Sequence, residues 1–205
     1  VKENEIDVIV NCAAYTAVDK AEDNQELCAK LNSEAVGYLA KAAEENQAEF
    51  IQISTDYVFD GTNYVPYRET EPTCPNSVYG VTKLAGEKKA LEYCSKAMII
   101  RTAWLYSVFG NNFVKTMIRL GKERESLGVI FDQIGTPTYA RDLASAVFAA
   151  IRKGIIPGIY HFSNEGVCSW YDFTKSIHRI AGIGNCKVSP LHTDEYPAKA
   201  PRPHY

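Results

Sequence analysis

Two short β-branched runs separated by one long amphipathic segment constrain the fold more than any other feature of this chain. Residues 6–13 and 50–54 form the two runs, which are typical of buried strands. Residues 23–47 between them predict one long helix, whose apolar positions at helical spacing are Leu27, Leu31, Ala35, Tyr38, Leu39 and Ala42. A strand, a helix and a second strand in this order form a crossover that makes the two strands parallel.

The same alternation continues along the chain. Further strands are expected at residues 98–103, 127–131 and 159–162, and further helices at 77–93, 112–123, 141–153 and from an N-cap at Ser169 to about residue 180. This order predicts an α/β fold with a Rossmann-like, doubly wound parallel sheet and a small mixed α/β lobe. We expect a partial Rossmann-like domain over residues 1–156. The smaller lobe should take residues 157–205, together with segments of the earlier loops.

One expected element of such a fold has no counterpart in the sequence. Doubly wound folds bind a dinucleotide through a glycine-rich first turn. The only close glycine pair, Gly182 and Gly184, lacks a third glycine and follows a helical segment. We therefore expect the first β-α-β elements to precede residue 1.

Composition argues against several classes of partner. The 22 Lys and Arg residues against 25 Asp and Glu give a net charge of -3, with no long basic run, so nucleic acid is not an expected partner. The apolar runs are too short to span a membrane. The six cysteines show no CxxC pair and the four histidines no metal-ligand spacing, which predicts reduced thiols in a cytoplasmic protein and no metal site.

A phenol and an ammonium group lie one helical turn apart in the expected helix 77–93. Tyr79 and Lys83 are four residues apart, which places both on one face. At a separation of ~4 Å the lysine charge lowers the pKa of a phenol by up to about three units, toward working pH. Such a phenol can donate a proton to a carbonyl oxygen. The same spacing also occurs where a boundary tyrosine lies beside a solvated lysine, so the pair alone leaves both interpretations open.

Two strand ends supply further candidates. Thr55 and Asp56 follow the strand 50–54, at the edge where open α/β sheets bind ligands, and the Thr55 hydroxyl can both donate and accept a hydrogen bond. The alternative is that Thr55 and Asp56 only form an ordinary turn at the end of the strand. Residues 11–16 end the preceding strand with small side chains that let a planar ring approach the backbone, although tight helix packing would also explain them. The proline-rich residues 56–76 predict a long ordered loop, which is usually functional.

Several segments together resemble the extended short-chain dehydrogenase/reductase family. They are residues 8–22, 54–61, 78–87, 101–106 and 201–203. The resemblance implies that Tyr79 protonates the C4 oxygen of a dTDP-bound keto sugar, that Lys83 lowers the pKa of Tyr79 and binds the nicotinamide ribose, and that Thr55 completes a catalytic triad.

The resemblance also implies the ligand contacts. Ala14, Tyr15 and Thr16, with Tyr79 and Lys83, would line NADPH or NADH. Thr55, Asp56 and Trp104 would contact the dTDP sugar, whereas the residues themselves offer for Trp104 only a large amphipathic surface, with core packing as the alternative. Mg²⁺ is associated with assembly in parts of the family, but no acidic cluster of this chain matches it. A homodimer is a candidate assembly.

The function implied is hydride transfer from NADPH or NADH to C4 of a nucleotide-bound keto sugar. Two alternatives remain. One is another nucleotide-sugar reductase or an epimerase; the other is a non-catalytic NADP-binding regulatory subunit of the type that partners methionine adenosyltransferase. Because the family's glycine-rich loop is missing and the chain stops just after its Arg-Pro segment, we expect a chain trimmed at both ends that binds the cofactor weakly by itself.

Overall fold

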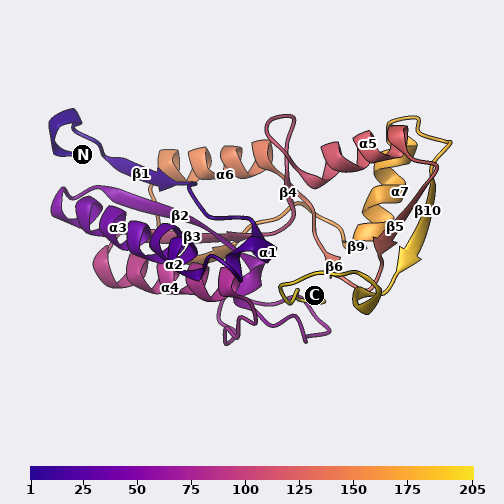
Figure 1. Cartoon of the computed structure of the whole chain (residues 1–205). Coiled ribbons are helices and arrows are strands. Elements are labelled where there is room, and N and C mark those ends of the chain that lie inside the picture. Colours follow the sequence, from indigo (N-terminus) through magenta and orange to yellow (C-terminus); the bar gives the residue numbers. More distant parts are fainter. The chain divides into compact units, whose positions relative to one another are not determined.

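The computed structural model describes all 205 residues (Figure 1). The chain forms two compact units. The first unit holds residues 1–102, 145–162 and 198–203, and the second holds residues 103–144, 163–197 and 204–205. This division differs from the boundary expected between residues 156 and 157, because residues 103–144 pack with the second unit and the C-terminal residues 198–203 pack with the first. None of the helices has both the length and the apolar character needed to cross a membrane.

The first unit is built on a sheet of four parallel strands. They are β1 (Val8–Asn11), β2 (Glu49–Thr55), β3 (Ala97–Thr102) and β8 (Gly158–His161), hydrogen-bonded in that order. The predicted parallel sheet is thereby confirmed. Its register places Ser54 opposite Arg101, and Arg101 opposite His161, so that these three residues share one row across the sheet.

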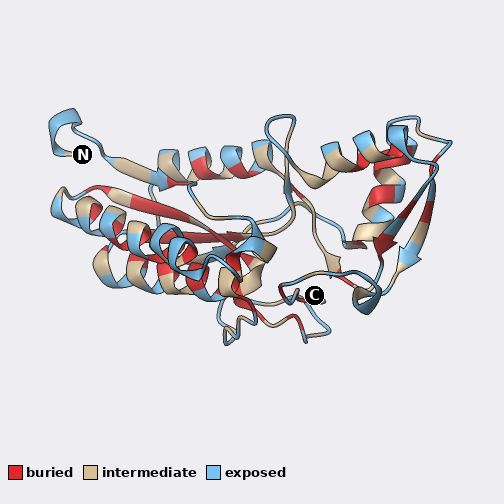
Figure 2. Cartoon of the chain, in the orientation of Figure 1, coloured by how far each residue is buried: buried red, intermediate tan, exposed pale blue.

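Helices α3 (Ala35–Glu45) and α4 (Val78–Tyr93) cover one face of this sheet, and α6 (Ala140–Lys153) lies on the other side in Figure 1. Helix α4 begins where the Ser77 hydroxyl accepts a hydrogen bond from the Gly80 amide at 3.2 Å, as an N-cap should. The core between the helices and the sheet is the dense buried region of Figure 2; its main side chains are Val36, Ala40, Ala43, Phe50, Ala90 and Ile99.

The long helix expected over residues 23–47 is interrupted. It consists of α2 (Gln25–Ala29), a π-helical turn (Lys30–Glu34) and α3, and a short α1 (Val18–Ala21) precedes it. The predicted apolar face was wrong in part: Leu27, Leu31 and Tyr38 are exposed, whereas Ala35, Leu39 and Ala42 are half-buried. The fully buried positions include Cys28, Asn32, Val36, Ala40 and Ala43. Small side chains face α4 because the helices approach closely: a Cβ at Gly86 would lie 2.1 Å from the Asn32 carbonyl oxygen.

The second unit has its own small sheet and core. Strand β5 (Ser126–Ile130) pairs in parallel with β10 (Lys187–Leu191), so the predicted strand 127–131 does not join the main sheet. Helices α5 (Phe113–Glu123) and α7 (Trp170–Ile180) pack on this pair around Met117, Leu127, Val129, Ile177 and Val188. Ser169 forms a capping box with Asp172, which confirms the predicted start of α7.

Four two-residue strands complete the second unit. Strand β4 (Leu105–Tyr106) pairs in parallel with β7 (Thr138–Tyr139), and β6 (Ile134–Gly135) pairs antiparallel with β9 (Cys168–Ser169). Strands this short carry no periodicity that a sequence pattern could reveal.

Residues 198–203, here called the C-terminal segment, are tied to α1 by the carboxylate of Asp19. Its Oδ1 accepts hydrogen bonds from the Lys199 amide at 3.1 Å, the Ala200 amide at 3.0 Å and Arg202 Nη1 at 2.9 Å. Its Oδ2 accepts one from Arg202 Nη2 at 2.7 Å. The hydrogen bonds from Arg202 outweigh the effect of burial and lower the pKa of Asp19 to about 2.

We expect Asp19→Asn to destabilise the protein by roughly 1 kcal/mol at pH 7, a value reduced for the solvent exposure of this ion pair. The folded-state pKa lies below the unfolded one, so the stabilisation is complete above about pH 4 and disappears as the pH falls toward 2. Urea unfolding of the wild type and the variant at several pH values measures this. Asp23→Asn, at an exposed pair with Lys199, is the control. A stability difference that does not shrink in acid would contradict the assignment.

Candidate active site

Four of the residues singled out in the sequence lie together where β2 ends and α4 begins. Thr55 is the last residue of β2, and its hydroxyl donates to Asp56 Oδ1 at 2.9 Å and accepts from the Tyr57 amide at 3.3 Å. Tyr79 and Lys83 occupy successive turns at the start of α4. Lys83 is 4% exposed, and its Nζ donates to the Ile53 carbonyl oxygen of β2 at 2.7 Å.

The Tyr79 side chain lies close enough to Thr55 and Asp56 for both groups to influence its pKa. The hydrogen of the Thr55 hydroxyl goes to Asp56. The Tyr79 ring also packs edge-on against Tyr57, with ring centroids 5.4 Å apart. This contact requires glycine at position 80, where a Cβ would lie 2.2 Å from the Tyr57 carbonyl oxygen.

The acidities differ from the expectation drawn from the Tyr79 and Lys83 spacing. Burial raises the pKa of Tyr79 to about 12, and the nearby Thr55 side chain only partly opposes this effect. Burial also lowers the pKa of Lys83 to about 8, against the opposing charge of Glu87. The prediction of a lowered phenol pKa was therefore wrong for this state of the protein: desolvation dominates, and the ammonium group binds a backbone carbonyl oxygen. Tyr79 keeps its proton at neutral pH.

Asp56 is half-buried, like Tyr79, and follows directly after Thr55. Burial raises the pKa of its carboxyl group to about 6, although hydrogen bonds from Thr55 and from backbone amides oppose the shift. Thr55 and Asp56 are thus joined by a hydrogen bond and lie next to the Tyr79 phenol.

The predicted cofactor-lining residues Ala14, Tyr15 and Thr16 follow β1. The Asn32 side chain makes hydrogen bonds to both the amide and the carbonyl group of Tyr15. Its Oδ1 accepts from the Tyr15 amide at 2.8 Å, and its Nδ2 donates to the Tyr15 carbonyl oxygen at 3.2 Å. The Cys12 thiol lies close enough to Lys83 to influence its pKa. Residues 12–16 therefore form an anchored loop beside Lys83.

Asn32 is not among the site residues predicted from the sequence. It is 1% exposed and lies in the π-helical turn, a feature that often marks functional sites in helices. Its Nδ2 also lies 3.3 Å from Cys28 Sγ and 3.3 Å from Thr82 Oγ1. The sequence contained one signal for Asn32, namely its four-residue spacing from both Cys28 and Val36, which puts it on their helix face. An asparagine that is buried on such a face must find hydrogen-bond partners.

Trp104, the remaining predicted substrate residue, belongs to the second unit. Its backbone has a φ of 48°, a left-handed conformation that is uncommon for a side chain of this size. The indole stacks on Trp170 with ring centroids 3.4 Å apart and planes 10° apart. Trp170 was not singled out in the sequence. The stack gives Trp104 a packing role and fixes the orientation of its ring.

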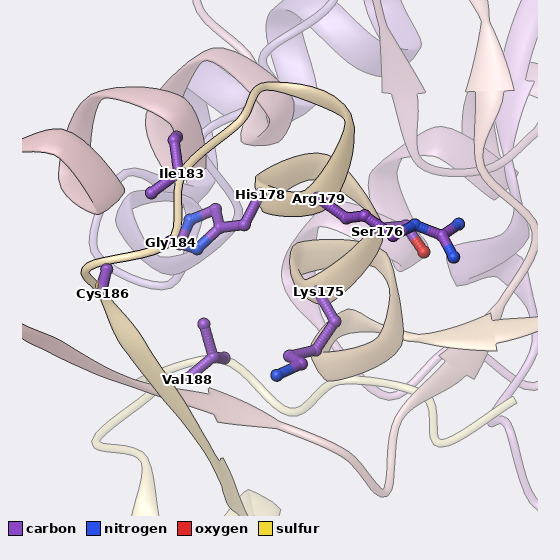
Figure 3. A pocket seen from close by; sticks show the side chains of 8 residues that line it. All are labelled: Lys175, Ser176, His178, Arg179, Ile183, Gly184, Cys186 and Val188. Carbon is purple, nitrogen blue, oxygen red and sulfur yellow. The ribbon is translucent and has the colours of Figure 1, made fainter.

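A cavity of about 470 Å³ in the second unit contains none of the predicted residues (Figure 3). Side chains of α7 and of the segment leading into β10 line it. His178 lies against α5, with its Nε2 donating to the Met117 carbonyl oxygen at 3.0 Å. Elsewhere in the chain, no three His, Cys, Asp or Glu side chains are grouped so as to hold a metal ion.

The parallel sheet, with a threonine at one strand end and a Tyr-x-x-x-Lys pair on the next helix, defines a Rossmann-like protein of the dehydrogenase/reductase class. The family described as RmlD substrate binding domain matches residues 1–205, and the chain belongs to this family. It is 48% identical to the dTDP-4-dehydrorhamnose reductase of Escherichia coli, an alignment that covers 97% of this chain and 69% of that protein.

Solved structures show the same fold. A dTDP-4-dehydrorhamnose reductase from Clostridium acetobutylicum has a TM-score of 0.96 at 48% identity, covering 100% of this chain and 72% of that one. The reductase from Bacillus anthracis, solved in complex with NADP, has a TM-score of 0.97 at 44% identity, with the same coverage of 100% and 72%. The predicted Rossmann-like α/β class is thus confirmed.

Proposed function

We propose that this chain forms the catalytic part of a reductase that converts dTDP-4-dehydro-L-rhamnose to dTDP-L-rhamnose with NADPH or NADH. The observation that carries the proposal is the grouping of Tyr79 with the hydrogen-bonded pair Thr55 and Asp56, and with the buried Lys83 on the next turn of the same helix. The identity of nearly half with reductases of that name, one of them solved with NADP, supports it.

The loop of residues 12–16 fits a nicotinamide cofactor. It offers small side chains and an anchored backbone next to the only ammonium group of this site, so Ala14, Tyr15 and Thr16 would contact the cofactor and Lys83 its ribose. When bound, the cofactor supplies the hydride that goes to C4 of the sugar.

The chain's own residues supply the proton. Tyr79 is fully protonated at neutral pH and donates its hydrogen to the C4 oxygen as negative charge develops there. In this proposal Thr55, next to the phenol, hydrogen-bonds the Tyr79 oxygen during the reaction and donates to the phenolate. The positive charge of Lys83, one turn away, stabilises the phenolate.

We assign sugar-nucleotide contacts to Thr55, Asp56 and Trp104. Thr55 and Asp56 lie beside the phenol in the first unit, and the stacked Trp104 presents a rigid aromatic ring in the second.

A turnover assay on the full-length protein tests the proposal. With NADPH or NADH, we expect reduction of dTDP-4-dehydro-L-rhamnose at least ~100-fold more efficient than that of other 4-keto nucleotide sugars, with dTDP-L-rhamnose identified by NMR. Preference for another keto sugar would make the protein a different nucleotide-sugar reductase. Absence of turnover with every substrate would refute catalysis and favour a regulatory subunit, for which a pull-down with methionine adenosyltransferase is the next measurement.

A further inference from the structure

A second pair of charges is buried behind the candidate active site. The Glu87 and Arg101 side chains are 2% and 4% exposed. Arg101 Nη2 donates to Glu87 Oε2 at 2.7 Å, and Arg101 Nε lies 3.0 Å from Oε1 and 3.2 Å from Oε2. The Ser54 hydroxyl donates to Oε1 at 2.5 Å. Both oxygens of the carboxylate are thus held in place, and its charge is compensated.

This pair connects α4 to one row of the parallel sheet. Ser54, Arg101 and His161 are register partners on β2, β3 and β8, and Glu87 reaches the same row from α4. Arg101 Nη1 lies 3.5 Å from His161 Nε2, while His161 Nδ1 donates to the Tyr67 carbonyl oxygen at 3.1 Å. Since Ser54 immediately precedes Thr55, Glu87 fixes the position of α4 relative to the strand end that carries Thr55.

Glu87 also faces Lys83. The two residues are four apart on α4, which places them one turn apart on the face that packs on the sheet. The other titratable groups that influence Lys83 are the thiols of Cys12, from the loop after β1, and Cys28, from α2. Glu87 is the largest of the charge effects that favour the ammonium form against its burial.

Stability alone does not account for such a pair. Burying two charges costs several kcal/mol of desolvation, and apolar side chains of similar volume are often equally or more stabilising. A carboxylate at this position does what an apolar side chain cannot: it holds Arg101 and Ser54 by hydrogen bonds and places the negative end of an ion pair one helical turn from the Lys83 ammonium group.

We propose that Glu87, held by Arg101 and Ser54, is a positioning residue of the active site that places a carboxylate one turn from Lys83 and holds α4 in register with Thr55. The inference rests on the proposed function for its catalytic meaning. Its physical content, a charge interaction between Glu87 and Lys83, is independent of turnover.

Titration of Lys83 by NMR tests the interaction without any ligand. In full-length protein labelled with carbon-13 at lysine Cε, the Lys83 signal is the one that disappears in Lys83→Met. We expect it to titrate near pH 8 in the wild type. In Glu87→Gln the midpoint should fall by about one to two pH units, because a nearby negative charge that favours the ammonium form is lost. Glu92→Gln, an exposed carboxylate on the same helix, is the matched control and should change nothing.

Kinetics then test the positioning role. We expect Glu87→Gln to lower kcat at pH 8 about tenfold and to move the basic limb of the kcat profile to lower pH by the amount seen by NMR, with KM within about threefold. A loss of kcat with no movement of the limb would mean a merely structural role and overturn the proposal. An inactive wild type would instead refute the proposed function and leave the NMR result standing.

A paired variant covers the case in which Glu87→Gln does not fold. Glu87→Gln with Arg101→Met removes both charges, so that no unpaired guanidinium remains buried. We expect this variant to fold and the Lys83 midpoint to stay below that of the wild type. A wild-type midpoint in the folded double variant would overturn the proposal.

Discussion

Tyr79→Phe is expected to lower kcat of the full-length reductase at least ~100-fold, because the phenyl ring keeps the shape of the side chain and loses the proton donor. The effect on KM should be small, since the lost hydrogen bond acts mainly as charge develops on the substrate oxygen. Steady-state rates with dTDP-4-dehydro-L-rhamnose measure both constants. The unfolding midpoint should stay close to that of the wild type, because the ring still packs on Tyr57.

Tyr93→Phe is the matched control for this variant. Tyr93 lies at the other end of α4, where its ring contacts the Lys41 ammonium group, so the same chemical change should leave kcat unaltered. If Tyr79→Phe retained more than half of the wild-type rate, Tyr79 would have no part in the mechanism. Its position beside Thr55 would then serve packing alone.

Lys83→Met is expected to reduce kcat by about two orders of magnitude while leaving stability equal or increased. The activity falls because the phenolate loses its neighbouring positive charge. Stability rises because burial lowers the pKa of Lys83 to about 8 in the folded state. At any pH at which the lysine is protonated in the unfolded chain, burying it therefore costs free energy, and methionine removes this cost. The gain should therefore be largest at neutral pH and vanish above about pH 10.

Lys88→Met, on the exposed side of α4, controls for the loss of a lysine from this helix. Denaturant unfolding at pH 7 and pH 10, combined with rate measurements, separates the two consequences. A strongly destabilised Lys83→Met protein would show that the hydrogen bond to the Ile53 carbonyl oxygen outweighs desolvation, and would make Lys83 a structural residue.

The parts of the site that depend on local spacing could be predicted from the sequence. Tyr79 and Lys83 share a helix face because of their four-residue separation, and Ser77 is a recognisable cap just before them. Thr55 lies beside them because carboxyl ends of parallel strands meet at one sheet edge, and the alternating strands and helices already predicted such a sheet.

The parts of the fold and of the site that depend on contacts between distant segments could not be predicted from the sequence. The buried face of residues 25–45 follows Cys28 and Asn32 rather than Leu27 and Leu31, because α4 approaches closely and only small or paired side chains fit there. The pairing of β5 with β10 joins segments some sixty residues apart that have no shared pattern. The pKa values of Tyr79 and Lys83 depend on how deeply the whole fold buries them, which spacing along one helix does not contain.

The division of the chain restricts how this architecture can evolve. The second unit is assembled from three separate stretches, residues 103–144, 163–197 and 204–205, with parts of the first unit between them. A continuous exchange of the second unit between relatives would therefore carry residues 145–162 and 198–203 of the first unit with it. Those residues include strand β8 of the main sheet and the partners of Asp19, so a chimaera must match both units at once.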